Sequence, residues 1–478
     1  MSFINSLFAW SILFGVLCSA CNRKTPTPQQ LIPIPFELTA TPTTPFPSLA
    51  ITNVSIVDVE NGTIIPDQTV LILDDLILKI GLAAEVAVPS GIQVISGNGM
   101  YLIPGLVDAH VHYFDPDTFG NLMIANGVLF VRDMGLPTES ILPLRDSLNR
   151  GEILGPEMVA TGSILDGYPP LIPSISQGLQ TPEESRAAVQ NLAKAGVDMI
   201  KVYSLLKKDV FLAILDEASK QGLKVVGHVP DSIYIEDAAR SGMASSEHLF
   251  GFEKAVGQLL GEPLKLYYNG MGADTQYLDR LNEVDPQELK DFYERIRASG
   301  LTVCPTVVVF KVGTQTRAFQ SGNFPKSEYI SSKVLDIWRS QWSSQSDLEE
   351  TIWQNWAIMV KGLSQAGVPM MVGTDLLVPG IIPGFSVHDE MEIWQQAGIP
   401  PLDILRSATI IPYQFMGVYE RTGSITEGKH ASMLLLRANP LEDIRNTREI
   451  EGVFLHGRYF NQQDIQELTK DIQSAVEK

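Results

Sequence analysis

Two histidines near residue 110 have a spacing that suits metal binding. They close the segment LIPGLVDAHVH (residues 102–112) as His110 and His112. Side chains two positions apart on a strand project from the same face, so both imidazoles can bind one ion. On its own, such a pair is as readily explained by two structural or surface histidines. The metal interpretation therefore depends on what the rest of the chain supplies.

A lysine in an apolar strand-like segment is the second unusual feature. Lys201 lies in VDMIKVYSL (residues 197–205), where alternation places it on the same face as Tyr203. A charged lysine there is unfavourable unless it is paired or modified. Burial favours the neutral amine, which reacts with CO₂ to give a carbamate, an anionic ligand that can bridge two metals. The alternative is a lysine whose stem lies along the strand and whose ammonium reaches water.

Three further side chains follow apolar, strand-like segments. His228 ends LKVVGH, His248 ends SSEH, and Asp375 ends PMMVGTD. Each histidine alone is compatible with a structural role, and Asp375 alone is compatible with a helix cap. Together with the first three side chains, they predict metal-binding groups at the ends of several strands.

The middle of the chain has the pattern of a (β/α)₈ barrel. Between residues 103 and 420, short apolar runs such as 125–132, 198–203 and 223–228 alternate with amphipathic stretches such as 182–195 and 207–221. Alternating strands and helices over such a length predict an α/β fold with a TIM-like barrel. The carboxyl ends of barrel strands converge on one mouth, so the six side chains are expected to meet there.

Both ends of the folded part have a β-rich texture. Residues 49–102 and 421–462 carry β-branched, alternating runs with turn signals such as Asn61-Gly62. They predict one small β-sandwich domain, formed from both ends and lying beside the barrel. Residues 463–478 are predicted to be a C-terminal tail.

The first 48 residues are predicted to serve export and tethering. Leu7–Ala20 is an apolar run of 14 residues, which is short for a membrane span but suits a signal peptide. The small residues before Cys21 resemble a lipoprotein cleavage site. Residues 1–21 would then be the signal peptide, Cys21 the lipidated residue, and 22–48 a Thr/Pro-rich linker. The protein would be a membrane-anchored lipoprotein facing the periplasm or the cell exterior. The alternative is an uncleaved N-terminal anchor.

Composition excludes several classes of function. The chain has 478 residues, of which 45% are hydrophobic and 19% charged, as in soluble globular proteins. With 35 basic and 55 acidic residues its net charge is −20, which repels phosphate backbones and excludes nucleic acid as a favoured partner. Three cysteines provide neither a disulfide framework nor a Cys-type zinc site.

These motifs resemble the amidohydrolase superfamily of metal-dependent hydrolases. The resemblance is carried by PGLVDAHVH, Lys201, His228, His248 and the GTD of residues 373–375. It extends to GVLFVRDMG (127–135), HDEMEIWQQAGIPPLDILRSAT (388–409) and GSITEGKHASMLLLRANPLEDI (423–444). Within the superfamily, the chain is most similar to the imidazolonepropionase-like and prolidase-like branch.

The resemblance implies roles for individual residues. Two divalent ions, preferably zinc, would be bound by six residues: His110, His112 and Asp375 at the first metal, His228 and His248 at the second, and carboxylated Lys201 between them. A metal-bridging hydroxide would attack the substrate, with Asp375 taking and returning the proton. His388 would contact the substrate, and Tyr203 would hydrogen-bond a substrate carboxylate or the developing oxyanion.

Three functions remain open at this point. The first is hydrolysis of amide bonds in small molecules such as dipeptides or N-acyl amino acids. The second uses the same site on cyclic amides or for ring deamination. The third is a non-catalytic, surface-binding lipoprotein. The complete ligand set argues against the third, and Lys201 argues against a one-metal deaminase. Assembly into a homo-oligomer is compatible with the sequence.

Overall fold

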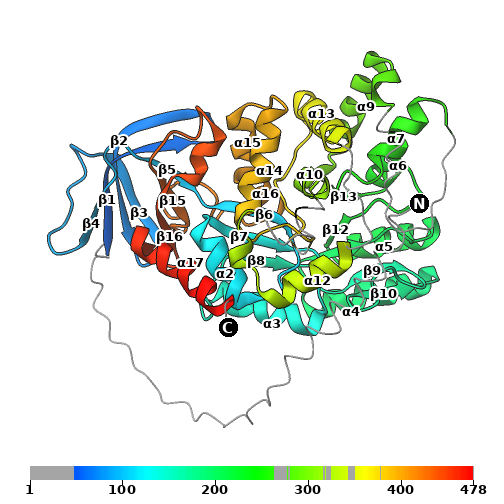
Figure 1. Cartoon of the computed structure of the whole chain (residues 1–478), viewed down its shortest axis with the longest axis horizontal. Helices are drawn as coiled ribbons and strands as arrows, with labels where there is room; N and C mark the ends of the chain where they lie inside the picture. Colours follow the sequence, from blue (N-terminus) through cyan, green and yellow to red (C-terminus); the bar gives the residue numbers. More distant parts are fainter. Residues whose placement is uncertain are drawn as a thin grey trace, which may run out of the picture.

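The computed structural model describes residues 48–262, 277, 280–315, 318, 324–342, 350–376 and 378–476. Within these ranges the chain forms a β-rich unit and a larger α/β unit (Figure 1). No helix in these ranges is long and apolar enough to cross a membrane. The predicted signal peptide and the predicted lipidation site Cys21 lie outside the described residues.

The β-rich unit draws strands from both ends of the described chain. They are β1 (Leu49–Asp58), β2 (Thr63–Leu73), β3 (Leu76–Leu82), β4 (Gln93–Ser96), β5 (Tyr101–Pro104), β15 (Met433–Leu436), β16 (Ile450–Leu455) and β17 (Arg458–Phe460). The order is β17-β16-β15-β5-β1-β2-β3, with β4 pairing β1. β15 pairs antiparallel with β5, so that Met433 lies opposite Pro104. The strands therefore form one eight-stranded sheet, whereas the sequence predicted a β-sandwich of two sheets.

A small apolar core supports this sheet. Ile51, Val70, Leu102 and Leu435 are among the buried residues that pack together there. They come from β1, β2, β5 and β15, so the core links strands that are far apart in the sequence. Burial of such side chains is the main favourable contribution to joining the two ends of the chain.

The α/β unit contains two parallel sheets. One is three-stranded, with β6 (Leu106–Val111), β7 (Val128–Asp133) and β8 (Glu157–Ala160). The other has the order β10-β9-β11-β12-β13-β14. Its strands are β9 (Ile164–Gly167), β10 (Ser176–Leu179), β11 (Met199–Val202), β12 (Lys224–Gly227), β13 (Met243–Glu247) and β14 (Thr302–Cys304).

Backbone hydrogen bonds connect the two parallel sheets. Asp198 N–H donates to Ala160 O at 2.9 Å, which joins the β11 side to β8. On the other side, residues 369–376 lie between β14 and β6: Met371 N–H donates to Val303 O, and Ala109 N–H donates to Val372 O, both at 2.9 Å. This order is TIM-barrel-like. The sequence predicted one closed sheet. The described residues do not form it, because residues 369–376 make only isolated bridges to their neighbours.

Helices surround the parallel strands (Figure 1). They are α2 (Pro116–Ala125), α3 (Thr138–Asn149), α4 (Pro182–Ala195), α5 (Lys208–Lys220), α6 (Ile235–Arg240), α7 (Phe252–Leu259), α9 (Pro286–Ser299), α10 (Val307–Gly313), α12 (Ser332–Trp342), α13 (Glu350–Ala366), α14 (Phe385–Gln396), α15 (Pro401–Ser407) and α16 (Ile410–Phe415). The sequence explains α4 well. Thr181 and Glu184 form a capping box at its start, and Gly196 ends it with φ of 89°.

The last described segment is a helix. α17 (Gln462–Val476), red in Figure 1, packs against α2 and β16. Part of the predicted C-terminal tail therefore contributes to the contact between the β-rich and α/β units.

Candidate metal centre

His110 at the end of β6, His112 just after it and the aspartate of residues 369–376 meet at the carboxyl ends of the parallel strands. Asp375 Oδ1 lies 3.4 Å from His110 Nε2 and 3.6 Å from His112 Nε2. Both histidines are buried, whereas 15% of the Asp375 side chain is exposed. The Asp375 carboxylate is thus the part of this group that solvent or a ligand can reach.

The other two predicted histidines lie beside this group. His228 follows β12 and His248 follows β13, so neighbouring parallel strands deliver both to the same end. The His248 ring centroid is 4.4 Å from that of His110 and 5.0 Å from that of His228. His248 Nδ1 is also 3.8 Å from Asp375 Oδ2. All four histidines and Asp375 therefore form one cluster.

Lys201 on β11 faces the same cluster and is 1% exposed. Its Nζ lies 5.9 Å from the centre of the Tyr203 ring, and that ring stacks on His228 at 3.9 Å between centroids. Burial lowers the pKa of Lys201 to about 8, against the opposing effect of Glu247 and Asp375. Within the described residues, no carboxylate lies at ion-pair distance from Lys201 Nζ.

Each histidine has its Nδ1 held by a neighbouring group. The partners are Glu247 Oε2 for His110 (3.0 Å), Gly135 O for His112 (2.8 Å), Ser204 Oγ for His228 (2.9 Å) and Thr306 Oγ1 for His248 (2.8 Å). A carbonyl oxygen only accepts, so His112 must donate from Nδ1 and keep the Nε2 lone pair. This arrangement is the usual one around histidine ligands of metals.

The donor set fits a divalent metal ion. His110 Nε2 is buried and has no hydrogen-bond partner among the described residues. Single ligand atoms of His110, His112 and Asp375 all lie within 4.8 Å of one another. A buried imidazole nitrogen without a partner is unfavourable unless something binds its lone pair. Histidine and carboxylate ligands suit zinc and related ions.

The electrostatics of the cluster favour the ligand forms. Burial lowers the pKa of His248 to about 4 and holds the pKa of His110 and His228 well below the ordinary value. These imidazoles are therefore neutral at pH 7. Burial alone would raise the pKa of Asp375, but His248, His110 and His112 outweigh it and hold that pKa below the usual range.

The backbone is unusual at three points of the site. His248, Thr306 and Asp375 have φ of 59°, 47° and 56°. Positive φ is uncommon outside glycine and is often found at functional sites. Here it turns the chain directly after β13, after β14 and within residues 369–376. The left-handed conformation at Asp375 ends the extended run at the residue that faces the histidines.

His388 is not part of this cluster, which corrects the role implied by the resemblance. It lies on α14, where its Nδ1 is 2.9 Å from Thr447 Oγ1 and its Nε2 is 2.9 Å from Asn126 O. Asn126 follows the last residue of α2. The first residues of that helix lie near the mouth, so Asn126 is at the end away from it. Because both ring nitrogens are engaged there, His388 connects structural elements and is not available to a substrate.

The sequence reasoning missed the group behind His110. Glu247 is fully buried and accepts hydrogen bonds from His110, Arg132 and Ser245. Asp133, the residue after Arg132, accepts from the backbone N–H groups of Tyr113 and Gly135. The one available signal was a charged residue directly before His248.

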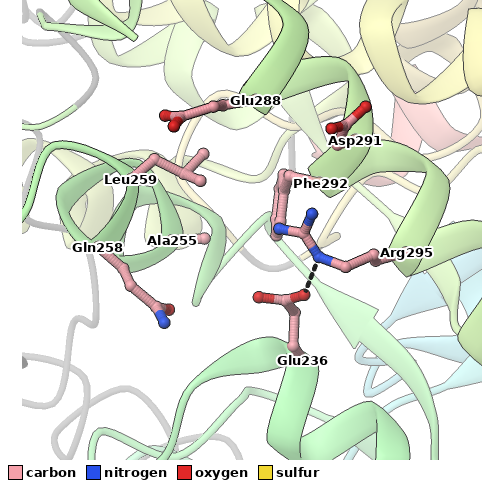
Figure 2. A pocket seen from close by; sticks show the side chains of 8 residues that line it. All are labelled: Glu236, Ala255, Gln258, Leu259, Glu288, Asp291, Phe292 and Arg295. Carbon is pink, nitrogen blue, oxygen red and sulfur yellow. Dashed lines mark hydrogen bonds and ion pairs between the residues drawn. The ribbon is translucent and has the colours of Figure 1, made fainter. Parts of the chain in front are cut away.

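A separate pocket on the outer surface is lined by none of the clustered histidines (Figure 2). It has a volume of about 310 Å³ and lies between α6, α7 and α9. Glu236 and Arg295 form an ion pair across it at 2.7 Å. None of the residues that line it belongs to the histidine cluster, so it is separate from the candidate metal centre.

Comparisons with known proteins agree with the fold and identify a family. The model of the "Amidohydrolase family" matches residues 101–459. An ochratoxinase from Aspergillus niger is 21% identical over 415 residues, covering 74% of this chain and 73% of the relative. A solved bottromycin amidohydrolase superposes with a TM-score of 0.72 at 22% identity, covering 89% of this chain and 90% of the other. A solved structure described as a "putative prolidase from Bifidobacterium longum" has a TM-score of 0.63 at 24% identity, covering 90% of this chain and 99% of the other.

The fold and the site define a metal-binding hydrolase. Because the family model covers most of the chain, the protein belongs to the amidohydrolase family. It is a hydrolase of amide C–N bonds, and its candidate His/Asp metal ligands are in place.

Proposed function

We propose that the protein is a two-metal hydrolase that cleaves the amide bond of small substrates such as dipeptides or N-acyl amino acids. The observation that carries this proposal is the buried His110 Nε2, which faces the Asp375 carboxylate and has no hydrogen-bond partner among the described residues. Three further histidines with held Nδ1 atoms surround it. A cluster of this composition has a ready use as a metal centre and no evident structural use.

His110, His112 and Asp375 are proposed to bind one ion, and His228 and His248 the other. Lys201, as a carbamate, would bridge them. The carbamate forms when the Nζ lone pair bonds to the carbon of CO₂ and Nζ loses a proton, which leaves one negative charge on two oxygens. The burial of Lys201 and the absence of an ion-pair partner in the described residues support this modification. Zinc suits these ligands.

Divalent ions in such a site lower the pKa of an attacking water and polarise the scissile carbonyl. The chain supplies the proton transfer. Asp375 is ionised at neutral pH, so a carboxylate oxygen can accept the proton of the water and deliver it to the leaving nitrogen. Tyr203, held by stacking on His228, is proposed to donate its hydroxyl to a substrate carboxylate or to the developing oxyanion.

The substrate class is tested by a screen. The fold neighbours named as an amidohydrolase and a prolidase support small amide or peptide substrates. Zinc-loaded protein would be offered a library of dipeptides, N-acyl amino acids and cyclic amides, with release of amine as the readout. Turnover of the linear amides is expected. Exclusive hydrolysis of cyclic amides or release of ammonia from rings would replace this substrate class with the second alternative.

We also propose that the protein is exported and anchored through Cys21. This rests on the apolar run before Cys21 and the Thr/Pro-rich segment after it. A single acyl chain binds membranes weakly, and two bind stably. Cys21→Ser should move the protein from the membrane to the soluble exported fraction or block its processing. Normal processing with unchanged membrane association would contradict the proposal.

A further inference from the structure

Glu247 has an unusual position for a carboxylate. It is the last residue of β13, it has no exposed surface, and it lies directly behind His110. Oε2 accepts from His110 Nδ1 at 3.0 Å and from Arg132 Nη2 at 2.8 Å. Oε1 accepts from the Ser245 hydroxyl at 2.6 Å. Both oxygens are therefore engaged, and one of them serves a predicted metal ligand.

Arg132 holds this carboxylate from a second strand. Its Nη1 donates to Ser245 Oγ at 3.1 Å, and its Nε donates to Ala109 O at 2.6 Å. Ala109 directly precedes His110 on β6, and Arg132 lies on β7. The guanidinium thus fixes both the carboxylate and the backbone next to His110. The neighbouring strands β6 and β7 are thereby connected at one imidazole to β13, which lies far from them in the sequence.

We propose that Glu247 is a positioning residue for metal binding, and that Arg132 holds it in place. Glu247 keeps His110 in the tautomer with a proton on Nδ1, so the Nε2 lone pair points toward Asp375, where the first metal would bind. This inference rests on the proposed function for the presence of the metal. The orientation of His110 itself follows from the contacts of Glu247 alone.

An alternative role for Glu247 as a metal ligand does not fit the contacts. Ligand atoms of His110, Glu247 and Cys304 also lie within 4.8 Å of one another. However, Glu247 already accepts three hydrogen bonds, and a guanidinium nitrogen at 2.8 Å would repel a cation bound to the same oxygen. A carboxylate that accepts from a histidine ligand is a familiar support for metal sites, and its loss usually weakens metal binding about 10- to 100-fold.

The test must avoid leaving a buried charge unpaired. Removing one partner of a buried ion pair is strongly destabilising, whereas replacing both by apolar side chains is often tolerated. The main variant is therefore Arg132→Met with Glu247→Leu. The matched control is Arg421→Met with Glu157→Leu, because Glu157 is also a buried barrel-strand glutamate with an arginine at 2.6 Å. Glu247→Gln is the second variant: it removes the counter-ion of Arg132, but the guanidinium keeps hydrogen bonds to Ser245 Oγ, to Ala109 O and to the amide oxygen of Gln, so this variant is used where it folds.

Two readouts are used, neither of which needs a substrate. The ¹⁵N shifts of the histidine rings, assigned with His110→Asn, report the tautomer of His110 in metal-free protein. Titration with Zn²⁺ reports the affinity of the site. The wild type and the control should show one Nδ1–H tautomer and equal affinity. The main variant should lose the single tautomer and bind Zn²⁺ about 10- to 100-fold more weakly than the wild type. The Zn²⁺ affinity of Glu247→Gln should lie between those of the wild type and the main variant.

An unchanged tautomer and an unchanged Zn²⁺ affinity in the folded variants would overturn the proposal. If the main variant does not fold, Glu247→Gln decides by the same two readouts. A wild-type chain that binds no Zn²⁺ would contradict the proposed function instead. The tautomer in metal-free protein would still decide whether Glu247 positions His110.

Discussion

Asp375 is hydrogen-bonded to His110 through its backbone, and its carboxylate faces the His110 ring. Its N–H donates to His110 O at 2.9 Å, and its Oδ1 lies 3.4 Å from His110 Nε2. The first bond places residues 369–376 against β6, and the positive φ of Asp375 turns its carboxylate toward the histidine rings. Folding of the chain therefore brings these two candidate ligands together without a metal, which would reduce the ordering that metal binding must impose.

Asp375→Asn should abolish most turnover while the fold persists. The backbone bond to His110 does not depend on the side-chain charge, but the amide can no longer accept the proton of the attacking water. Loss of a general base usually lowers the rate about 10²- to 10⁴-fold. kcat at saturating substrate and the thermal melt would be measured together. Asp198→Asn is the control, because Asp198 binds Arg145 at the opposite end of β11. Activity within a few-fold of wild type would remove Asp375 from the mechanism.

Tyr203→Phe removes the hydroxyl of Tyr203 and keeps the aromatic ring, so it tests the role of the hydroxyl alone. The phenyl ring can still stack on His228, so metal content should not change. Loss of one hydrogen bond to a charged group should lower kcat/KM about 10- to 100-fold. A rise in KM alone would assign the hydroxyl to a substrate carboxylate, and an equal fall in kcat would assign it to the oxyanion. Unchanged kcat/KM would show that the hydroxyl contacts neither.

His388→Asn should affect stability and its pH dependence more than catalysis. Burial lowers the pKa of His388 to about 3, so between about pH 6.5 and 3 the unfolded chain binds a proton that the folded chain does not. The free energy of unfolding therefore falls as the pH drops through this window, by up to about 1.4 kcal/mol per pH unit.

The His388→Asn variant lacks this proton uptake, so its stability should depend less on pH between 6.5 and 3. Urea unfolding at several pH values measures the difference. At pH 7 the variant is less stable, because Thr447 and Asn126 O lose their partner, yet the folded variant should retain kcat. An equal pH dependence in both proteins, or loss of kcat without loss of stability, would restore a catalytic role for His388.

The residues that gather at the candidate site could be recognised in the sequence, because the position of each depends on local sequence. The spacing of His110 and His112 fixes a shared strand face, and the apolar neighbours of Lys201 indicate burial. Glu247 could not be found in this way, since its partner Arg132 is 115 residues away. The structural contacts of His388 could not be predicted either, because its partner Asn126 lies 262 residues away in the sequence.

The fold was predictable to a similar degree. Alternating apolar and amphipathic segments give the type and order of the elements. They do not give the pairing of β15 with β5, which turns the predicted sandwich into one sheet. Nor do they show that residues 369–376 join the two parallel sheets through isolated bridges, because these bridges pair segments that are far apart in the sequence.

The metal content of Lys201→Ala tests the central claim most directly. As an ammonium ion Lys201 would repel two nearby cations, whereas a carbamate would bridge them. Elemental analysis of the wild type should find about two ions per chain, as in other two-metal hydrolytic sites. Lys224→Ala, at the exposed start of β12, should match the wild type. Lys201→Ala should hold one ion or none and lose activity. Adding a short carboxylic acid should restore part of the metal content and part of the activity. A Lys201→Ala protein that keeps two ions and hydrolyses substrate normally would contradict the two-metal account.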